Sequence, residues 1–551
     1  MEEQAISIVQ KILMREMDVL KRVWMFRAKD VSVDYLINMD MGSYRSTLRR
    51  SAPVLWGLLV ACVQSERAMD ENLIKSPETL CTVVAFQLAK QHSANANLFA
   101  ARFSIYLWSC GTPRAVVDIL AKFGLSLSFF SIRECLDNLS KACLASTINA
   151  VRRPGVAFGM GYDNLNISTS THAEQYLHAR PKIENLTMHT IYIMKNATFV
   201  EMQASPMDVH AQRAPLLTLS DLSPKPLVIA RINHQFNVQI IQILLEHPAF
   251  NHLGPDDKAA IAQYKDVRRP MVHSRTEEFP LPVAEIDEST TEGNHQNLED
   301  MRLGDLTPYL QGTPFVGMPD YFHVMNWLLM ILSVYRGSTI DDGSLATYIN
   351  LLGLNRLGSA KPDHHLLERL VLQVYKGHIL AAWVQISGFH AIEEFAASKP
   401  DRNLLSQLGE RIAHRYIGAP SKTAFRTSAD DPTTTDEIFR QCVLFNRDAA
   451  IYLELKNAIQ LGDFGRVEDL IPTMICIFCG GGSPNYANEL LHLLQNLKYS
   501  WLPTFADMVR DNILVNISGR HNSYMPVDMN QEHHIRLLKV CLNGHWQDGI
   551  T

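Results

Sequence analysis

Apolar residues recur at intervals of three and four positions through the first 150 residues of the chain. Leu13, Met17 and Leu20 illustrate the spacing, and Val23 and Trp24 continue it. This period places apolar side chains on one face of a helix. Proline, which interrupts helices, is nearly absent from the same stretch. The pattern therefore predicts an N-terminal helical domain over residues 1–150.

The period changes after Arg152-Arg153-Pro154-Gly155. Residues 156–164 are mostly apolar up to Asp163 and predict a buried strand that ends in an acid at a turn. Residues 187–194 predict a second strand. Residues 225–245 open on Pro-Leu-Val-Ile-Ala and predict a strand that passes into a helix. These segments indicate an α/β core.

Helical spacing returns later and divides this core. Residues 277–305 hold nine acids and one base, which predicts a solvated loop. Beyond it, Leu366, Leu370 and Val374 follow at i, i+4 and i+8, as in a helix. The chain divides into an N-terminal helical domain, a first core part with the acidic loop, a helical insertion and a C-terminal core part, over residues 1–150, 151–335, 336–470 and 471–551.

Charge and hydropathy narrow the class of protein. Lys and Arg number 51 against 57 Asp and Glu, so the chain as a whole is not a strongly basic nucleic-acid binder. The first 50 residues carry nine bases against seven acids, which predicts no basic patch there. The N-terminus lacks the apolar core of a signal peptide, and no apolar stretch reaches the length of a membrane span. We therefore expect an intracellular protein, in the nucleus or cytoplasm, with no membrane partner.

Nine cysteines are scattered without regular spacing, which is typical of reduced thiols in an intracellular protein. Cys476 and Cys479 form a lone C-x-x-C motif in an apolar run. A zinc site would need two further ligands, and the nearby histidines have irregular spacing. The motif is interpreted as two buried thiols.

Asp163 is the first candidate functional residue, since a carboxylate fixed at the end of a buried strand is well placed to hold a divalent metal. The alternative is an Asp-Asn turn that closes a hairpin. Asp320 follows a proline at the head of an apolar helix candidate, and His323 comes one turn later. Together they offer a metal ligand and a proton-handling group. The alternative for this pair is a helix cap beside a satisfied histidine.

The C-terminal region supplies further acids. Ala487 and Leu490 belong to the apolar stripe of a predicted helix, and Glu489 lies off that stripe. Glu532 begins the run Glu-His-His, in which adjacent side chains on a helix point apart. Both acids are candidates for a site, and both are equally compatible with a solvated helix face.

Several segments, in order, resemble a large fungal family of uncharacterised proteins of unknown function, whose members resemble mobile-element products. They are Val-Ala-Phe-Gly-Met-Gly-Tyr-Asp-Asn-Leu-Asn, Ile-Glu-Asn-Leu-Thr-Met-His-Thr, Tyr-Phe-His-Val-Met-Asn, Ser-Pro-Asn-Tyr-Ala-Asn-Glu-Leu-Leu and Asp-Met-Asn-Gln-Glu-His. The layout is also similar to that of transposases with a ribonuclease-H-like core. That resemblance implies an α/β fold with a ribonuclease-H-like mixed sheet, interrupted by the helical insertion.

The resemblance to these transposases also implies a catalytic set. Asp163 matches their first acid, Asp320 with His323 the second, and Glu489 the third, with Glu532 as its competitor. A Gly-Asp-Gln type of segment is reduced here to Leu-Gly-Asp-Leu-Thr, which makes Asp305 an alternative second acid.

In such cores the carboxylates hold two Mg²⁺ or Mn²⁺ ions. The implied function is a transposase-derived protein that binds DNA and cleaves or transfers phosphodiester bonds. The alternative is a catalytically inactive helical-α/β interaction protein of mobile-element origin, which works through protein partners or self-association.

Overall fold

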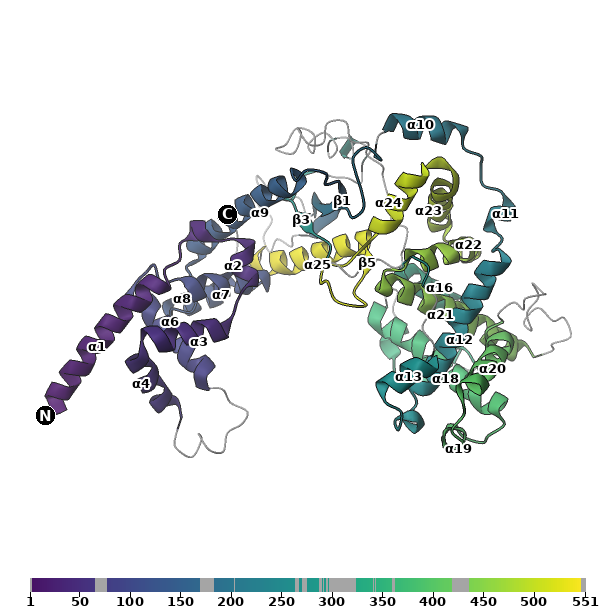
Figure 1. Cartoon of the computed structure of the whole chain (residues 1–551), viewed down its shortest axis with the longest axis horizontal. Helices are drawn as coiled ribbons and strands as arrows, with labels where there is room; N and C mark the ends of the chain where they lie inside the picture. The colour runs from purple at the N-terminus through teal and green to yellow at the C-terminus, as the bar shows by residue number, and fades with distance from the viewer. Residues whose placement is uncertain are drawn as a thin grey trace, which may run out of the picture. The chain divides into compact units, whose positions relative to one another are not determined.

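The computed structural model describes residues 2–546, apart from several segments. The segments not described are 65–76, 169–182, 203, 263–266, 270–274, 287–289, 291, 294–295, 297–323, 340, 342, 359–361 and 419–435. The chain forms two compact units (Figure 1). The first contains residues 1–193, 277–311 and 529–551, and the second contains residues 194–276 and 312–528.

The N-terminal part of the first unit is helical, as the spacing predicts. Its helices are α1 (Glu2–Val23), α2 (Val33–Ile37), α3 (Met41–Ser51), α4 (Pro53–Val63), α6 (Pro77–His92), α7 (Leu98–Ser109), α8 (Arg114–Lys122) and α9 (Phe129–Val151). Leu20 and Trp24 pack with Phe86 in one buried apolar cluster. Glu16, itself buried, accepts hydrogen bonds from the first backbone N–H groups of α4, those of Val54 and Leu55, at 2.9 and 2.8 Å. This carboxylate satisfies donors that a helix start leaves open.

A small antiparallel sheet completes the first unit. Its strands are β1 (Phe158–Ser168), β2 (Ile183–Ile193) and β3 (Glu278–Pro280), in that order. The C-terminal helix α25 (Val527–Trp546) packs on one face, where its Ile535 joins Leu165, Ile167 and Met188 in a buried cluster. The described strands pair only antiparallel, whereas the sequence predicted a mixed sheet.

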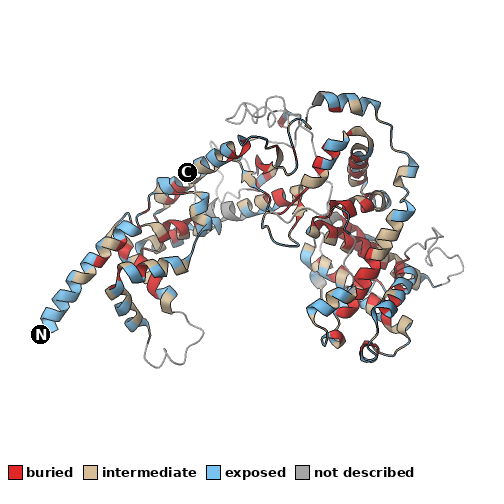
Figure 2. Ribbon diagram, viewed as in Figure 1, coloured by how far each residue is buried: buried red, intermediate tan, exposed pale blue. Residues whose placement is uncertain are grey.

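The second unit is almost wholly helical. Its helices are α10 (Ala204–Arg213), α11 (Leu219–Leu222), α12 (Pro226–Leu245), α13 (Pro255–Ala262), α16 (Val324–Tyr335), α17 (Leu345–Leu351), α18 (His364–Ser387), α19 (Ile392–Ala397), α20 (Arg402–Ile412), α21 (Glu437–Leu461), α22 (Phe464–Gly480), α23 (Pro484–Gln495) and α24 (Pro503–Asn512). A two-stranded ladder joins β4 (Leu514–Val515) to β5 (Met525–Pro526). Figure 2 shows the buried residues of this unit concentrated along α12, α21 and α22.

The strand predicted at the start of 225–245 is wrong, because the whole segment forms helix α12. Pro226 occupies the first helical turn, where its missing N–H costs nothing. Arg231, Gln235 and Gln239 then recur every four residues along one side of the helix. None of the described helices combines the length and the apolar content needed to cross a membrane.

Polar contacts join α18 to α21 inside the second unit. Asn446 donates from its amide nitrogen to the carbonyl of Tyr416 at 3.0 Å, so its amide oxygen accepts from Nδ1 of His378 at 2.8 Å. Nε2 of His378 then accepts from the hydroxyl of Tyr348 at 2.9 Å. Two residues further along α21, the buried Asp448 accepts from the hydroxyl of Tyr335 at 2.6 Å. Burial raises the pKa of the Asp448 carboxyl.

The hydrogen bonds of His378 with Asn446 and Tyr348 predict a loss of stability in acid. Burial lowers the pKa of His378 below its ordinary value of 6.5, so below that pH the unfolded chain binds a proton that the folded chain excludes. The free energy of unfolding should therefore fall as the pH drops from about 6.5 towards the lowered pKa of the folded state. Urea unfolding at several pH values between about 5 and 8, the range in which histidine titrates, measures this free energy. His378→Gln should flatten the dependence, and an unchanged slope in that variant would contradict the assignment.

Candidate functional site

Asp163 lies within β1 and not at its end, so the predicted turn at this residue is wrong. The strand continues to Ser168, and Asp163 pairs with Met188 of β2. Leu165 and Ile167 are buried at alternating positions beyond Asp163, and their burial extends the strand. The strand-ending acid that the sequence predicted is therefore an internal, half-buried position.

The register places Asp163 on the sheet face that α25 covers, because Met188 lies directly opposite and contacts Ile535. On the same face, Asn530 of α25 donates to the Tyr192 hydroxyl at 3.1 Å and to Glu278 at 2.7 Å. Gln531 donates to the carbonyl of Met188 at 2.8 Å. This face joins the sheet to the C-terminal helix by specific polar contacts.

Among the predicted acids, the structure describes Asp163, Glu489 and Glu532. Asp305, Asp320 and His323 lie outside the described residues. Glu489 is half-buried on α23, which belongs to the second unit, whereas Asp163 belongs to the first. Glu532 is exposed on α25.

In the part of the chain that the structure describes, no group of three or more His, Cys, Asp and Glu side chains is arranged to hold a metal ion. Because Asp305 and Asp320 lie outside that part of the chain, the two-metal site that the transposase resemblance implies stays a prediction.

A concentration of positive charge occurs where α1 ends. Lys21, Arg22, Arg27 and Lys29 lie within nine residues and are all exposed, with Asp18 and Asp30 as the flanking acids. We call these four residues the basic turn. The count of bases and acids over the first 50 residues did not reveal the basic turn, because the acids of that stretch lie outside residues 21–29. A count over a shorter window would have revealed it, since residues 21–29 contain four bases and no acid.

The backbone of the basic turn is fixed by its apolar neighbours. Trp24 and Phe26 alternate with the exposed residues and are buried in two different apolar clusters. The backbone N–H of Phe26 donates to Asn95 at 3.0 Å, and the carbonyl of Trp24 accepts from Leu98 at 3.3 Å. Because these anchors fix the chain, the intervening cationic side chains are directed to the surface.

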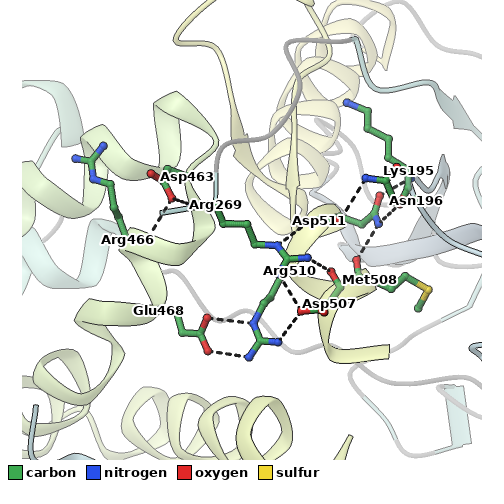
Figure 3. Close-up of polar contacts among 11 residues, drawn as sticks. Lys195, Asn196, Arg269, Asp463, Arg466, Glu468, Asp507, Met508, Arg510 and Asp511 are labelled. Carbon is green, nitrogen blue, oxygen red and sulfur yellow. Dashed lines mark hydrogen bonds and ion pairs between the residues drawn. The ribbon is translucent and has the colours of Figure 1, made fainter. Parts of the chain in front are cut away.

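The second unit contains a denser, half-buried network of paired charges (Figure 3). Arg269 pairs with Asp511 at 2.7 Å and with Asp507 at 2.8 Å. Arg510 forms a two-bond pair with Glu468, at 3.1 and 2.9 Å, and also contacts Asp507. Each arginine is thus neutralised by carboxylates, and the network joins α22, α24 and the segment at 267–269.

Two arginines converge on a single carboxylate beside this network. Arg231 donates to both oxygens of Asp469 at 2.9 and 2.8 Å, and Arg268 does the same at 3.1 Å for each bond. Behind them, the buried Arg466 pairs with the buried Glu454. The pocket that these residues line has room for about one water molecule. The arrangement is therefore suited to joining helices and not to binding a nucleotide.

One known protein family matches most of the second unit. Residues 211–317 and 297–549 match the model of a family of unknown function (DUF6589). The chain belongs to the DUF6589 family. The two matches include Asp305, Asp320, Glu489 and Glu532, and both begin after Asp163. No curated protein and no solved structure matches the chain.

Membership of DUF6589 confirms the expected family of unknown function. The fungal origin and the transposase likeness stay predictions. The sheet residue Asp163 and the basic turn lie N-terminal to the DUF6589 match, whereas helix α25, which packs on the sheet, lies within it.

Proposed function

We propose that this chain is a transposase-derived protein that binds DNA, and that the basic turn supplies phosphate contacts. The supporting observation is the exposure of Lys21, Arg22, Arg27 and Lys29 on a backbone that buried aromatic residues fix in place. Lysine and arginine neutralise backbone phosphates without reading the base sequence. We therefore expect binding that depends weakly on sequence and strongly on salt.

The distribution of charge supports the same surface. Residues 1–150 carry 17 Lys and Arg against 14 Asp and Glu, and the remaining residues carry 34 against 43. The N-terminal helices are thus the basic part of an acidic chain. Because acidic surface repels DNA, the contact is expected on these helices.

Replacing all four bases of the basic turn by glutamine should weaken DNA binding by about tenfold or more at low salt, since each loses a phosphate contact. Fluorescence anisotropy with a short labelled duplex of mixed sequence measures the dissociation constant. The matched control replaces four exposed bases of the same unit, Lys122, Arg133, Lys141 and Arg152. It carries the same change in net charge and should retain most of the affinity. Equal losses in both variants would contradict a local contact.

Phosphodiester cleavage is the second half of the proposal, and a metal titration decides it. If Mn²⁺ binds to a carboxylate site only in the folded chain, the melting temperature rises as the metal concentration rises. If the chain is a nuclease in which Asp163 binds the metal, this rise should disappear in Asp163→Asn. For a chain that binds without cutting, Mn²⁺ should leave both proteins unchanged.

The second candidate function is a catalytically inactive interaction protein. It is favoured by an exposed apolar stripe on α8 and its C-cap residue, where Val116, Ile119 and the C-cap Phe123 are 43, 53 and 60% exposed at i, i+3 and i+7. Such a stripe is typical of a surface that another protein covers. Absence of DNA binding at low salt together with no response to Mn²⁺ would favour this candidate.

A further inference from the structure

The C-terminal turn of α22 exposes two cysteines that the sequence predicted to be buried. Cys476 and Cys479 are both exposed, and Phe478 between them is 1% exposed. Phe478 packs against Trp327 and Tyr486 with ring centroids 5.7 Å apart in each pair. The aromatic residue therefore holds one side of the helix end in the core, and the two thiols lie on its solvent side.

The spacing of the two cysteines places them close together. Residues three apart in an α-helix have Cα atoms about 5 Å apart, by the rise and radius of the helix. That separation falls within the range of about 4.4–6.8 Å found in disulfides. Their Cβ atoms, about 5–6 Å apart in an intact helix, must approach to about 4 Å for the bond to form. A disulfide between Cys476 and Cys479 therefore requires the last helical turn to open slightly.

The sequence after the motif permits this opening. Gly480, Gly481 and Gly482 follow directly, and Gly482 has a φ of +76°, which favours glycine. A Cβ added to Gly480 or Gly482 would meet nothing within 4 Å. The backbone N–H of Gly481 still donates to the carbonyl of Ile477 at 2.8 Å and closes the turn. The end of α22 is thus adjacent to a short segment that can adjust.

We propose that Cys476 and Cys479 are a thiol-modification site that forms a reversible intrachain disulfide with a low-molecular-weight disulfide such as oxidised glutathione. The thiolate of one cysteine attacks a sulfur of oxidised glutathione and releases one glutathione thiolate, which takes up a proton. The thiolate of the second cysteine then attacks the mixed disulfide and releases the second glutathione. The protein loses two hydrogen atoms, that is two protons and two electrons, and one oxidised glutathione becomes two reduced molecules.

The position of the pair sets its reactivity and its consequence. Because the disulfide requires the last turn of α22 to open, the pair should remain reduced until the oxidised form of glutathione is abundant. Gly481 lies against Met330 of α16, since a Cβ added there would come within 2.6 Å of that side chain. Opening the last turn of α22 moves Gly481 and loosens its packing on α16.

The test uses the full reduced chain, incubated in buffers of increasing oxidised-to-reduced glutathione ratio and then alkylated. Mass spectrometry of the peptide that spans residues 476–479 should find it lighter by two hydrogen atoms. In Cys479→Ser, which lacks the second thiol, a mixed disulfide on Cys476 should accumulate to about tenfold or more above the wild-type level. Cys62 and Cys110 are exposed and have no second cysteine one helical turn away. They serve as internal controls, because a mixed disulfide formed on either of them with glutathione should persist.

Two results would overturn the proposal. The first is glutathione on Cys476 and Cys479 separately, with no crosslink, at ratios that modify Cys62 and Cys110. The second is an unmodified pair under those same conditions. Limited proteolysis supplies a second measurement, because oxidation should increase cleavage near Gly480–Gly482 in the wild type and not in Cys479→Ser.

Discussion

Arg466→Met should lower the free energy of unfolding of the second unit by about 3–5 kcal/mol, the usual effect of removing one partner of a buried ion pair. The side chains of Arg466 and Glu454 are 4 and 2% exposed. Arg466 donates from Nε to Glu454 at 2.8 Å and from Nη2 to Asn457 at 3.1 Å. Without the guanidinium, the buried Glu454 carboxylate loses its paired positive charge, while Gln239 still donates to it at 3.2 Å.

Chemical unfolding followed by circular dichroism measures this loss. Arg440→Met is the matched control, since Arg440 and Glu437 form an exposed ion pair at 3.2 Å on the same helix, α21. Exposed pairs contribute about 0–1 kcal/mol, so this variant should be nearly as stable as the wild type. Adding Glu454→Gln to Arg466→Met should recover part of the loss, because the uncompensated charge is removed. Equal stability of Arg466→Met and Arg440→Met would contradict the account of a buried network.

The helices of the second unit could be predicted from apolar spacing, whereas their polar contacts could not. Leu370 and Val374 mark one face of α18, and both are buried. In α12, however, the run of β-branched residues after Pro226 favoured a strand. There Arg231 and Gln239 contact Asp469 and Glu454, which lie more than 200 positions away in the sequence. Such long-range contacts override local propensity, and a single sequence does not reveal them.

The errors at Asp163 and at the cysteine motif have a common physical cause. Asp-Asn favours a turn in isolation, but pairing of β1 with β2 continues the strand through Asp163 to Ser168. Cys476 and Cys479 occur in an apolar run, but α22 buries Phe478 and directs both cysteines to solvent. In each case the neighbouring elements decide which side of the chain is buried, and the residue types alone do not.

The basic turn illustrates the reverse situation, in which the information was local. Lys21, Arg22, Arg27 and Lys29 stand close together in the sequence, and averaging over 50 residues concealed them. Their exposure depends on the burial of Trp24 and Phe26, which follows from contacts with α6 and α7. The charge cluster is therefore predictable from sequence, and its presentation is not.

The second large effect expected is on the salt dependence of DNA binding. Each phosphate contact contributes about 0.9 to the slope of the logarithm of affinity against the logarithm of salt concentration. Loss of four contacts should therefore lower the slope by about 3.6. Between about 50 and 200 mM salt, the wild type should then lose roughly 150-fold more affinity than the glutamine variant of the basic turn.

The measurement that tests the central claim most directly is this slope. It is determined for the wild type, the basic-turn variant and the control variant in which Lys122, Arg133, Lys141 and Arg152 are replaced. We expect a slope lower by about 3–4 only in the basic-turn variant, with the wild type and the control nearly equal. Equal slopes in all three proteins, or tight binding by the wild type that salt does not weaken, would contradict the proposal that this chain contacts DNA through Lys21, Arg22, Arg27 and Lys29.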